Sequence, residues 1–121
     1  MSLLGRLVKA IATTGKEPNA MATYAISFTL ESNSTYSTRY TSLMEQIRAC
    51  ATVWTETTSF ALVSTNETLD QLEHRLYFSS LMICPNDLLV VINVTSDPAT
   101  IRGTNLYPNT LRALLPSIVQ K

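Results

Sequence analysis

Thr-Tyr-Ala-Ile-Ser-Phe-Thr-Leu, residues 23–30, alternates between large apolar side chains and small or polar ones. Because successive side chains of a β-strand point to opposite faces, this stretch predicts a strand that is buried on one face only. The core face is expected to carry Tyr24, Ile26, Phe28 and Leu30. The other face is expected to carry Ala25, Ser27 and Thr29.

The residues that follow alternate between helical and strand patterns. Apolar positions from Tyr36 to Cys50 fall at helical spacing and predict a core-facing helix. Residues 53–56 and 59–64 are rich in β-branched and aromatic side chains, which predicts two short antiparallel strands. A second helix is expected from Thr68 to about Ser80, because Gln71 occupies the capping-box position. Residues 88–95 predict the last strand of this series.

The order strand, helix, strand, strand, helix, strand is typical of one fold class. It predicts an α+β, ferredoxin-like βαββαβ sandwich, in which an antiparallel sheet carries both helices on one face. We expect this core to span residues 21–95, with an N-terminal amphipathic extension at 1–20 and a C-terminal turn and helix at 96–121. The extension is expected to be a docking helix or a dispensable segment, with a targeting presequence as the alternative.

The last strand is apolar on both faces. Leu88, Val90, Ile92 and Val94 fall on one face, and Leu89 and Val91 on the other. Because both helices are expected to cover the same face of the sheet, we expect Leu89 and Val91 to need another cover.

The C-terminal residues offer such a cover. Tyr107-Pro108-Asn109 is a typical helix entry, and Pro116 is expected to limit or bend the helix. The stripe repeats at helical spacing through Leu111, Leu114, Leu115, Ile118 and Val119. We expect this stripe to pack against the core, the N-terminal helix or a second subunit.

Charge is distributed unevenly although the net charge is zero. Residues 21–95 carry three basic and seven acidic side chains, so the basic excess lies in the two ends of the chain. Because nucleic-acid affinity depends on several Lys or Arg residues contacting phosphates together, this composition supports such binding only weakly. Arg102 and Arg112 are the best candidates for phosphate contacts.

Other signals of chemistry are few. Cys50 and Cys84 are expected to be buried free thiols in a cytoplasmic protein, and no apolar run is long enough to span a membrane. The single histidine, His74, falls off the apolar stripe of its helix, where Asp70 could pair with it. The three glycines fit no P-loop or dinucleotide fingerprint. The aromatic side chains mostly fall on core stripes, which favours packing over base stacking.

Four segments of the chain, residues 21–28, 59–63, 68–76 and 87–95, carry a resemblance to a known family. Together they resemble the SinR-like group, which is related to the small ferredoxin-like protein of CRISPR spacer acquisition and to virulence-associated protein D. Nucleases of the wider family are expected to place an aspartate from the end of strand one of each subunit around a shared metal. The matching position here is Thr29, whose hydroxyl is a poor ligand for Mg²⁺.

The leading hypothesis is therefore a non-catalytic, homodimeric scaffold or interaction module without a cofactor. Its interface is predicted to include Ala25, Ser27, Thr29, Leu89, Val91, Leu111, Leu115 and Ile118. The first alternative is a metal-dependent endoribonuclease or toxin-like nuclease that uses Glu31 as its carboxylate and requires Mg²⁺. The second alternative is a small-molecule sensor that binds on the open face of the sheet.

Overall fold

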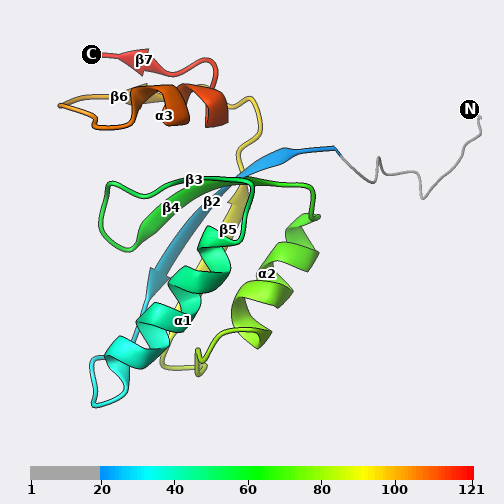
Figure 1. The fold of residues 1–121 in the computed structure, drawn as a ribbon, viewed down its shortest axis with the longest axis vertical. Helices are drawn as coiled ribbons and strands as arrows, with labels where there is room; N and C mark the ends of the chain where they lie inside the picture. Colours follow the sequence, from blue (N-terminus) through cyan, green and yellow to red (C-terminus); the bar gives the residue numbers. More distant parts are fainter. Residues whose placement is uncertain (1–19) are drawn as a thin grey trace, which may run out of the picture.

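The computed structural model describes residues 20–121, which form a sheet with helices on one face and a C-terminal layer on the other (Figure 1). The expected N-terminal helix falls on residues 1–19, outside the described part of the chain. The elements of the main sheet and its two helices are β2 (Ala22–Thr29), α1 (Tyr36–Arg48), β3 (Thr52–Trp54), β4 (Phe60–Thr65), α2 (Leu69–Phe78) and β5 (Leu88–Asn93). The C-terminal elements are β6 (Thr100–Ile101), α3 (Pro108–Leu114) and β7 (Val119–Gln120).

The main sheet has four strands in the order β3-β4-β2-β5, and each neighbouring pair is antiparallel. Strand β2, which contains the alternating stretch described above, is central and pairs with β4 on one side and β5 on the other. The short β3 and the longer β5 are the two edges. The expected α+β class with an antiparallel sheet is confirmed.

The main core lies between the sheet and the two helices α1 and α2. The core face of β2 supplies Tyr24, Ile26 and Phe28, all at most 4% exposed, as the alternation predicts. The helices supply Leu43, Met44, Ile47, Leu72 and Leu76. Both helices therefore cover the same face of the sheet, as Figure 1 shows.

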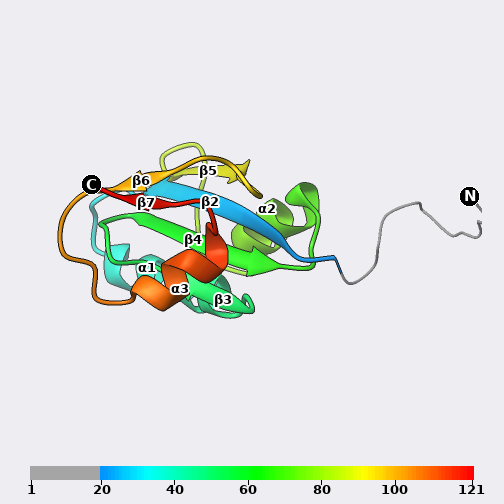
Figure 2. The same ribbon diagram turned by 90° about the horizontal axis from the view of Figure 1, so that it is seen from above.

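A second, smaller core lies on the opposite face of the sheet. Here Leu111, Leu114 and Leu115 of the C-terminal layer pack against Trp54 and Leu62 of the sheet. In Figure 2 helix α3 lies on the β3 side of the sheet. The C-terminal stripe is thus buried against the chain's own sheet, one of the three positions that the sequence allowed.

Helix boundaries follow local sequence signals. The capping box at Thr68 is present, because its side chain accepts a hydrogen bond from the backbone N–H of Gln71 and the Gln71 side chain accepts one from the N–H of Thr68. Helix α3 begins with Pro108 as expected but ends at Leu114. Pro116 disfavours the helical conformation of the residue before it, and Leu115 has φ −130° and ψ 81°.

The prediction that the helical stripe continues to Val119 was wrong, since Val119 lies in β7. Strand β7 pairs in parallel with β6, and no sequence pattern indicated this two-residue pairing. The predicted strands 53–56 and 59–64 are shifted to Thr52–Trp54 and Phe60–Thr65, with Ser59 at a positive φ of 55° in the turn between them.

The first turn of α1 also differs from expectation. Tyr36 and Tyr40 were expected on the core stripe, but each is 37% exposed, and their rings stack with centroids 6.0 Å apart. Arg39 occupies the inward position instead and is 2% exposed. Asp87 stabilises this inward position of Arg39, because it supplies a buried partner for the guanidinium group.

Candidate functional site

The sheet face opposite α1 and α2, here called the open face, is only partly covered by the C-terminal layer. Ala25, Leu62 and Trp54 lie beneath that layer. The remainder is exposed along β5, where the side chains that point to this face are apolar. We call Leu88, Val90 and Ile92, which are 59%, 43% and 52% exposed, the β5 strip.

The register of β2 and β5 corrects the predicted faces of the last strand. Ile26 pairs with Val91 and Phe28 with Leu89, so Leu89 and Val91 share the face of β2 that packs on the helices. The expectation that these two residues need another cover was therefore wrong. The β5 strip pairs instead with Ala25, Ser27 and Thr29, the small-residue face of β2.

The predicted interface residues thus fall into three groups. Ser27 and Thr29 are exposed on the open face beside the β5 strip. Leu89 and Val91 are partly buried against the main core. The remaining four belong to the second core within this chain: Ala25, Leu111, Leu115 and Ile118.

A cavity of about 600 Å³ lies between the open face and the C-terminal layer. Its walls are mostly apolar, and its floor includes Ala25 of the central strand. The apolar lining residues are Ala25, Trp54, Phe60, Leu62, Val94, Pro98, Ala99, Ile101, Leu111, Leu115 and Ile118. The polar lining residues are Glu56, Thr57, Asp97, Thr100, Arg102, Thr104 and Asn105.

Glu56 joins the sheet to the loop that precedes α3. One carboxylate oxygen accepts hydrogen bonds from the Trp54 indole at 2.8 Å and the Tyr107 backbone N–H at 3.0 Å. The other accepts one from the Leu106 N–H at 2.8 Å. The hydrogen bond from Leu106, with those from Tyr107 and Trp54, lowers the pKa of Glu56. The charged carboxylate therefore holds one wall of the cavity in place.

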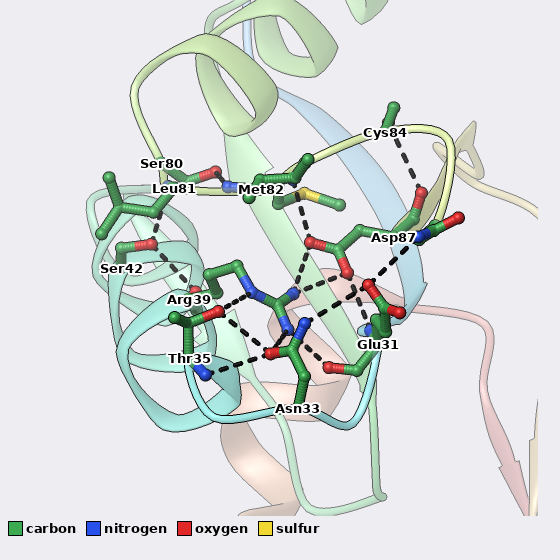
Figure 3. Close-up of polar contacts among 12 residues, drawn as sticks. Glu31, Asn33, Thr35, Arg39, Ser42, Ser80, Leu81, Met82, Cys84 and Asp87 are labelled. Carbon is green, nitrogen blue, oxygen red and sulfur yellow. Dashed lines mark hydrogen bonds and ion pairs between the residues drawn. The ribbon is translucent and has the colours of Figure 1, made fainter.

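A buried ion pair joins helix α1 to the residue before β5 (Figure 3). The Arg39 Nη1 lies 2.6 Å from each carboxylate oxygen of Asp87. Asp87 also accepts backbone hydrogen bonds from Glu31 at 2.8 Å and Ile83 at 2.9 Å. The other nitrogens of Arg39 donate to the Glu31 carbonyl and to the side chains of Asn33 and Thr35.

Burial by itself would raise the pKa of Asp87. The N–H groups of Glu31 and Ile83 and the Arg39 guanidinium outweigh that effect, so the pKa is lowered and Asp87 is charged. Because both side chains are buried and their hydrogen bonds stay within the chain, we assign the pair a structural role. The sequence analysis did not predict this pair. The spacing of Arg39, four residues before the core residue Leu43, could have indicated that Arg39 faces the core, and Asp87 directly precedes a strand.

Glu31, the carboxylate of the nuclease alternative, lies in the loop after β2. Its Oε1 accepts hydrogen bonds from Asn33 at 3.3 Å and Asn86 at 3.1 Å. Thr29 is the last residue of β2, and its side chain is exposed. Within residues 20–121, no group of three or more His, Cys, Asp or Glu side chains is placed to hold a metal ion.

The basic side chains are dispersed. Arg102 lines the cavity, whereas Arg112 lies on α3 and donates a hydrogen bond to Asn109 Oδ1 at 2.6 Å. These two candidates for phosphate contacts therefore have different surroundings. Two of the three arginines of residues 21–95 are engaged in ion pairs, Arg39 with Asp87 and Arg75 with Glu67.

His74 and the two cysteines occupy ordinary positions. His74 is exposed on α2 and its ring contacts Phe78, with centroids 4.4 Å apart. Cys50 is buried beside Arg75, and burial raises its pKa despite the hydrogen bond from Arg75. Cys84 is exposed, so the expectation that both thiols are buried was wrong for that residue.

No family model, curated protein or solved structure matches the chain. Among the helices of residues 20–121, none combines the length and apolar character that crossing a bilayer requires.

Proposed function

We propose that this chain is a cytoplasmic, non-catalytic interaction module that forms a homodimer through the exposed edge of β5. The observation that carries the proposal is the β5 strip, in which Leu88, Val90 and Ile92 are exposed on one face of an edge strand. The fold that we propose for the module is ferredoxin-like, and the strand order β3-β4-β2-β5 with two helices on one face supports it. We retain the relationship to the SinR-like group as part of the proposal.

The edge of β5 lacks the features that prevent strand pairing. Edge strands of monomeric proteins are commonly protected by lysine, proline, a bulge or a covering segment. The sequence of β5 is Leu-Leu-Val-Val-Ile-Asn, with no charged residue and no proline. Within residues 20–121, no strand pairs with its outer edge. An unprotected edge of six residues is therefore available for a second strand.

The backbone of β5 presents hydrogen-bonding groups to that second strand. The N–H of Val94 donates to the carbonyl of Thr23 at 2.8 Å, which continues the register of β2 and β5. Because hydrogen-bonded pairs alternate along an antiparallel ladder, Leu89 and Val91 direct their N–H and C=O groups away from β2.

A second copy of the chain fits this edge better than an unrelated partner. Two β5 strands related by a two-fold axis would run antiparallel, and each would present the same apolar strip to the other. In the joined sheet the two strips would lie side by side on one face, where cross-strand contacts between them would remove part of their apolar surface from water.

The mass of the native protein in solution tests this proposal. Size-exclusion chromatography with light scattering is expected to give twice the 13.4 kDa chain mass at micromolar concentration. The substitution Val90→Lys places a charge at the centre of the strip and is expected to give a folded monomer. Circular dichroism and thermal unfolding of the variant establish that it folds.

The matched control is Leu106→Lys, which makes the same kind of change at a leucine 73% exposed in the C-terminal layer. This control variant is expected to remain dimeric. A native protein that is monomeric at micromolar concentration would refute the dimer, and a dimer that persists in Val90→Lys would refute its location at β5.

A further inference from the structure

The cavity between the open face and the C-terminal layer has the features of a small-molecule site. Its volume of about 600 Å³ lies within the range of roughly 300–1,000 Å³ that is usual for such sites. Eleven of the eighteen lining residues are apolar, and the other seven are polar or charged. This combination is typical of pockets that bury an apolar body and orient it through one or two charges.

The cavity is held open by the fold. Ala25 leaves space at the floor, because it stands on the central strand between Leu62 and Ile92, its partners on either side. The wall formed by the loop before α3 is fixed through the three hydrogen bonds that Glu56 accepts. Pairing of β6 with β7 fixes the opposite wall.

Three charged residues line the cavity, and they differ in their hydrogen bonding. Glu56 is already the acceptor of three hydrogen bonds from its own chain. Asp97 and Arg102 are exposed, and neither side chain has a hydrogen-bond or ion-pair partner within residues 20–121. These two exposed side chains, here called the rim of the cavity, therefore offer one negative and one positive group to a ligand.

We propose that this cavity binds an α-amino acid with a large apolar side chain. In this arrangement Arg102 contacts the ligand carboxylate, Asp97 contacts the ammonium group, and the apolar side chain lies against Trp54 and Phe60. A zwitterion pairs with both side chains at once. A simple carboxylic acid would pair only with Arg102, and a simple amine only with Asp97. The proposal concerns the open face beneath the C-terminal layer and does not depend on dimerisation through β5.

Trp54 supplies a direct readout, because it is the only tryptophan of the chain and lines the cavity. Phenylalanine, phenylpropionate and phenethylamine share one apolar body and differ only in charged groups. Titration with phenylalanine is expected to change Trp54 emission and to raise the melting temperature, since a ligand of the folded state stabilises it. Phenylalanine is expected to bind more tightly than either analogue.

Two rim variants test the assigned contacts. Arg102→Gln is expected to weaken phenylalanine binding about fivefold, the upper end for an exposed ion pair, and to leave phenethylamine binding unchanged. Asp97→Asn is expected to do the same for phenylalanine and to leave phenylpropionate binding unchanged. Both residues are exposed, so the fold is expected to tolerate either change.

A filling variant tests the location. Ala25→Leu adds volume to the cavity floor and is expected to abolish the response to phenylalanine, whereas Ser27→Leu, on the same strand face but outside the cavity, is expected to preserve it. The proposal is overturned by the absence of any response to phenylalanine at millimolar concentration. Equal or tighter binding of either analogue, or equal responses of the two leucine variants, would overturn it as well.

Discussion

Nη1 of Arg39 lies 2.6 Å from both carboxylate oxygens of Asp87, which joins the first turn of α1 to the residue before β5. The two residues are 48 positions apart, and each is at most 2% exposed. Because Asp87 also accepts hydrogen bonds from the N–H groups of Glu31 and Ile83, the pair connects α1 with the loop after β2 and the loop before β5.

Removal of either partner is expected to destabilise the fold strongly. Arg39→Met leaves a buried carboxylate without its counter-ion, and Asp87→Asn leaves a buried guanidinium in the same state. Each is expected to lower the free energy of unfolding by about 3–5 kcal/mol, measured by urea denaturation. Arg48→Met, an exposed arginine of the same helix, is the control and is expected to change the free energy by less than about 0.5 kcal/mol.

The double variant separates the ion pair from its surroundings. In Arg39→Met with Asp87→Asn, neither residue leaves an unpaired charge, so the loss is expected to be smaller than the sum of the two single losses. Strict additivity in this cycle would contradict the assigned coupling between the two side chains.

Stability is expected to depend on pH through the same pair. The folded-state pKa of Asp87 is lowered, so its stabilising effect is complete above the unfolded pKa of about 3.9 and is lost as pH falls through the lower folded value. The difference in unfolding free energy between the native protein and Asp87→Asn is expected to narrow in that acidic window. A difference that stays constant from neutral pH to below the folded pKa would contradict this account.

Sequence periodicity predicted the main fold well because the two faces of β2 differ so clearly. Tyr24, Ile26 and Phe28 form the helix-covered face, and the capping box at Thr68 marks the start of α2 correctly. These are local signals, since each depends on spacing within one element. They do not specify how two strands align.

Features that depend on distant contacts were missed. The face of each β5 residue was assigned incorrectly, because both faces are apolar and only the register with β2 decides between them. The inward position of Arg39 depends on Asp87, and the cavity depends on how the C-terminal layer packs. The start of helix α3 at Pro108 was predicted. The sequence could not decide whether its apolar stripe packs against the core, the N-terminal helix or a second subunit, and the structure places it against Trp54 and Leu62.

The two thiols are expected to react at very different rates. Cys84 is exposed, whereas Cys50 is buried and burial raises its pKa, so less of it is in the reactive thiolate form. Iodoacetamide at neutral pH is expected to modify Cys84 alone in the folded protein and both residues in urea. Mass spectrometry of peptides locates the label, and rapid labelling of Cys50 without denaturant would contradict its burial.

Glu56→Gln is expected to loosen the C-terminal layer without disturbing the main core. A glutamine retains one acceptor oxygen but replaces the other with an NH₂ donor. That NH₂ group would face either the N–H of Leu106 or the N–H groups of Trp54 and Tyr107, so at least one of the three hydrogen bonds is lost. The emission of Trp54 is expected to shift to longer wavelength as its ring becomes hydrated, while far-ultraviolet circular dichroism stays unchanged.

The same wall is expected to respond to acid. The pKa of Glu56 is lowered, so its hydrogen bonds persist below the ordinary glutamate value of about 4.3 and are lost as pH falls through the lower folded value. Native protein is therefore expected to show an acidic shift in Trp54 emission that Glu56→Gln lacks. Glu73→Gln, an exposed glutamate on α2, is the matched control and is expected to keep the shift. An identical acid transition in the native protein and Glu56→Gln would show that another group sets the environment of Trp54.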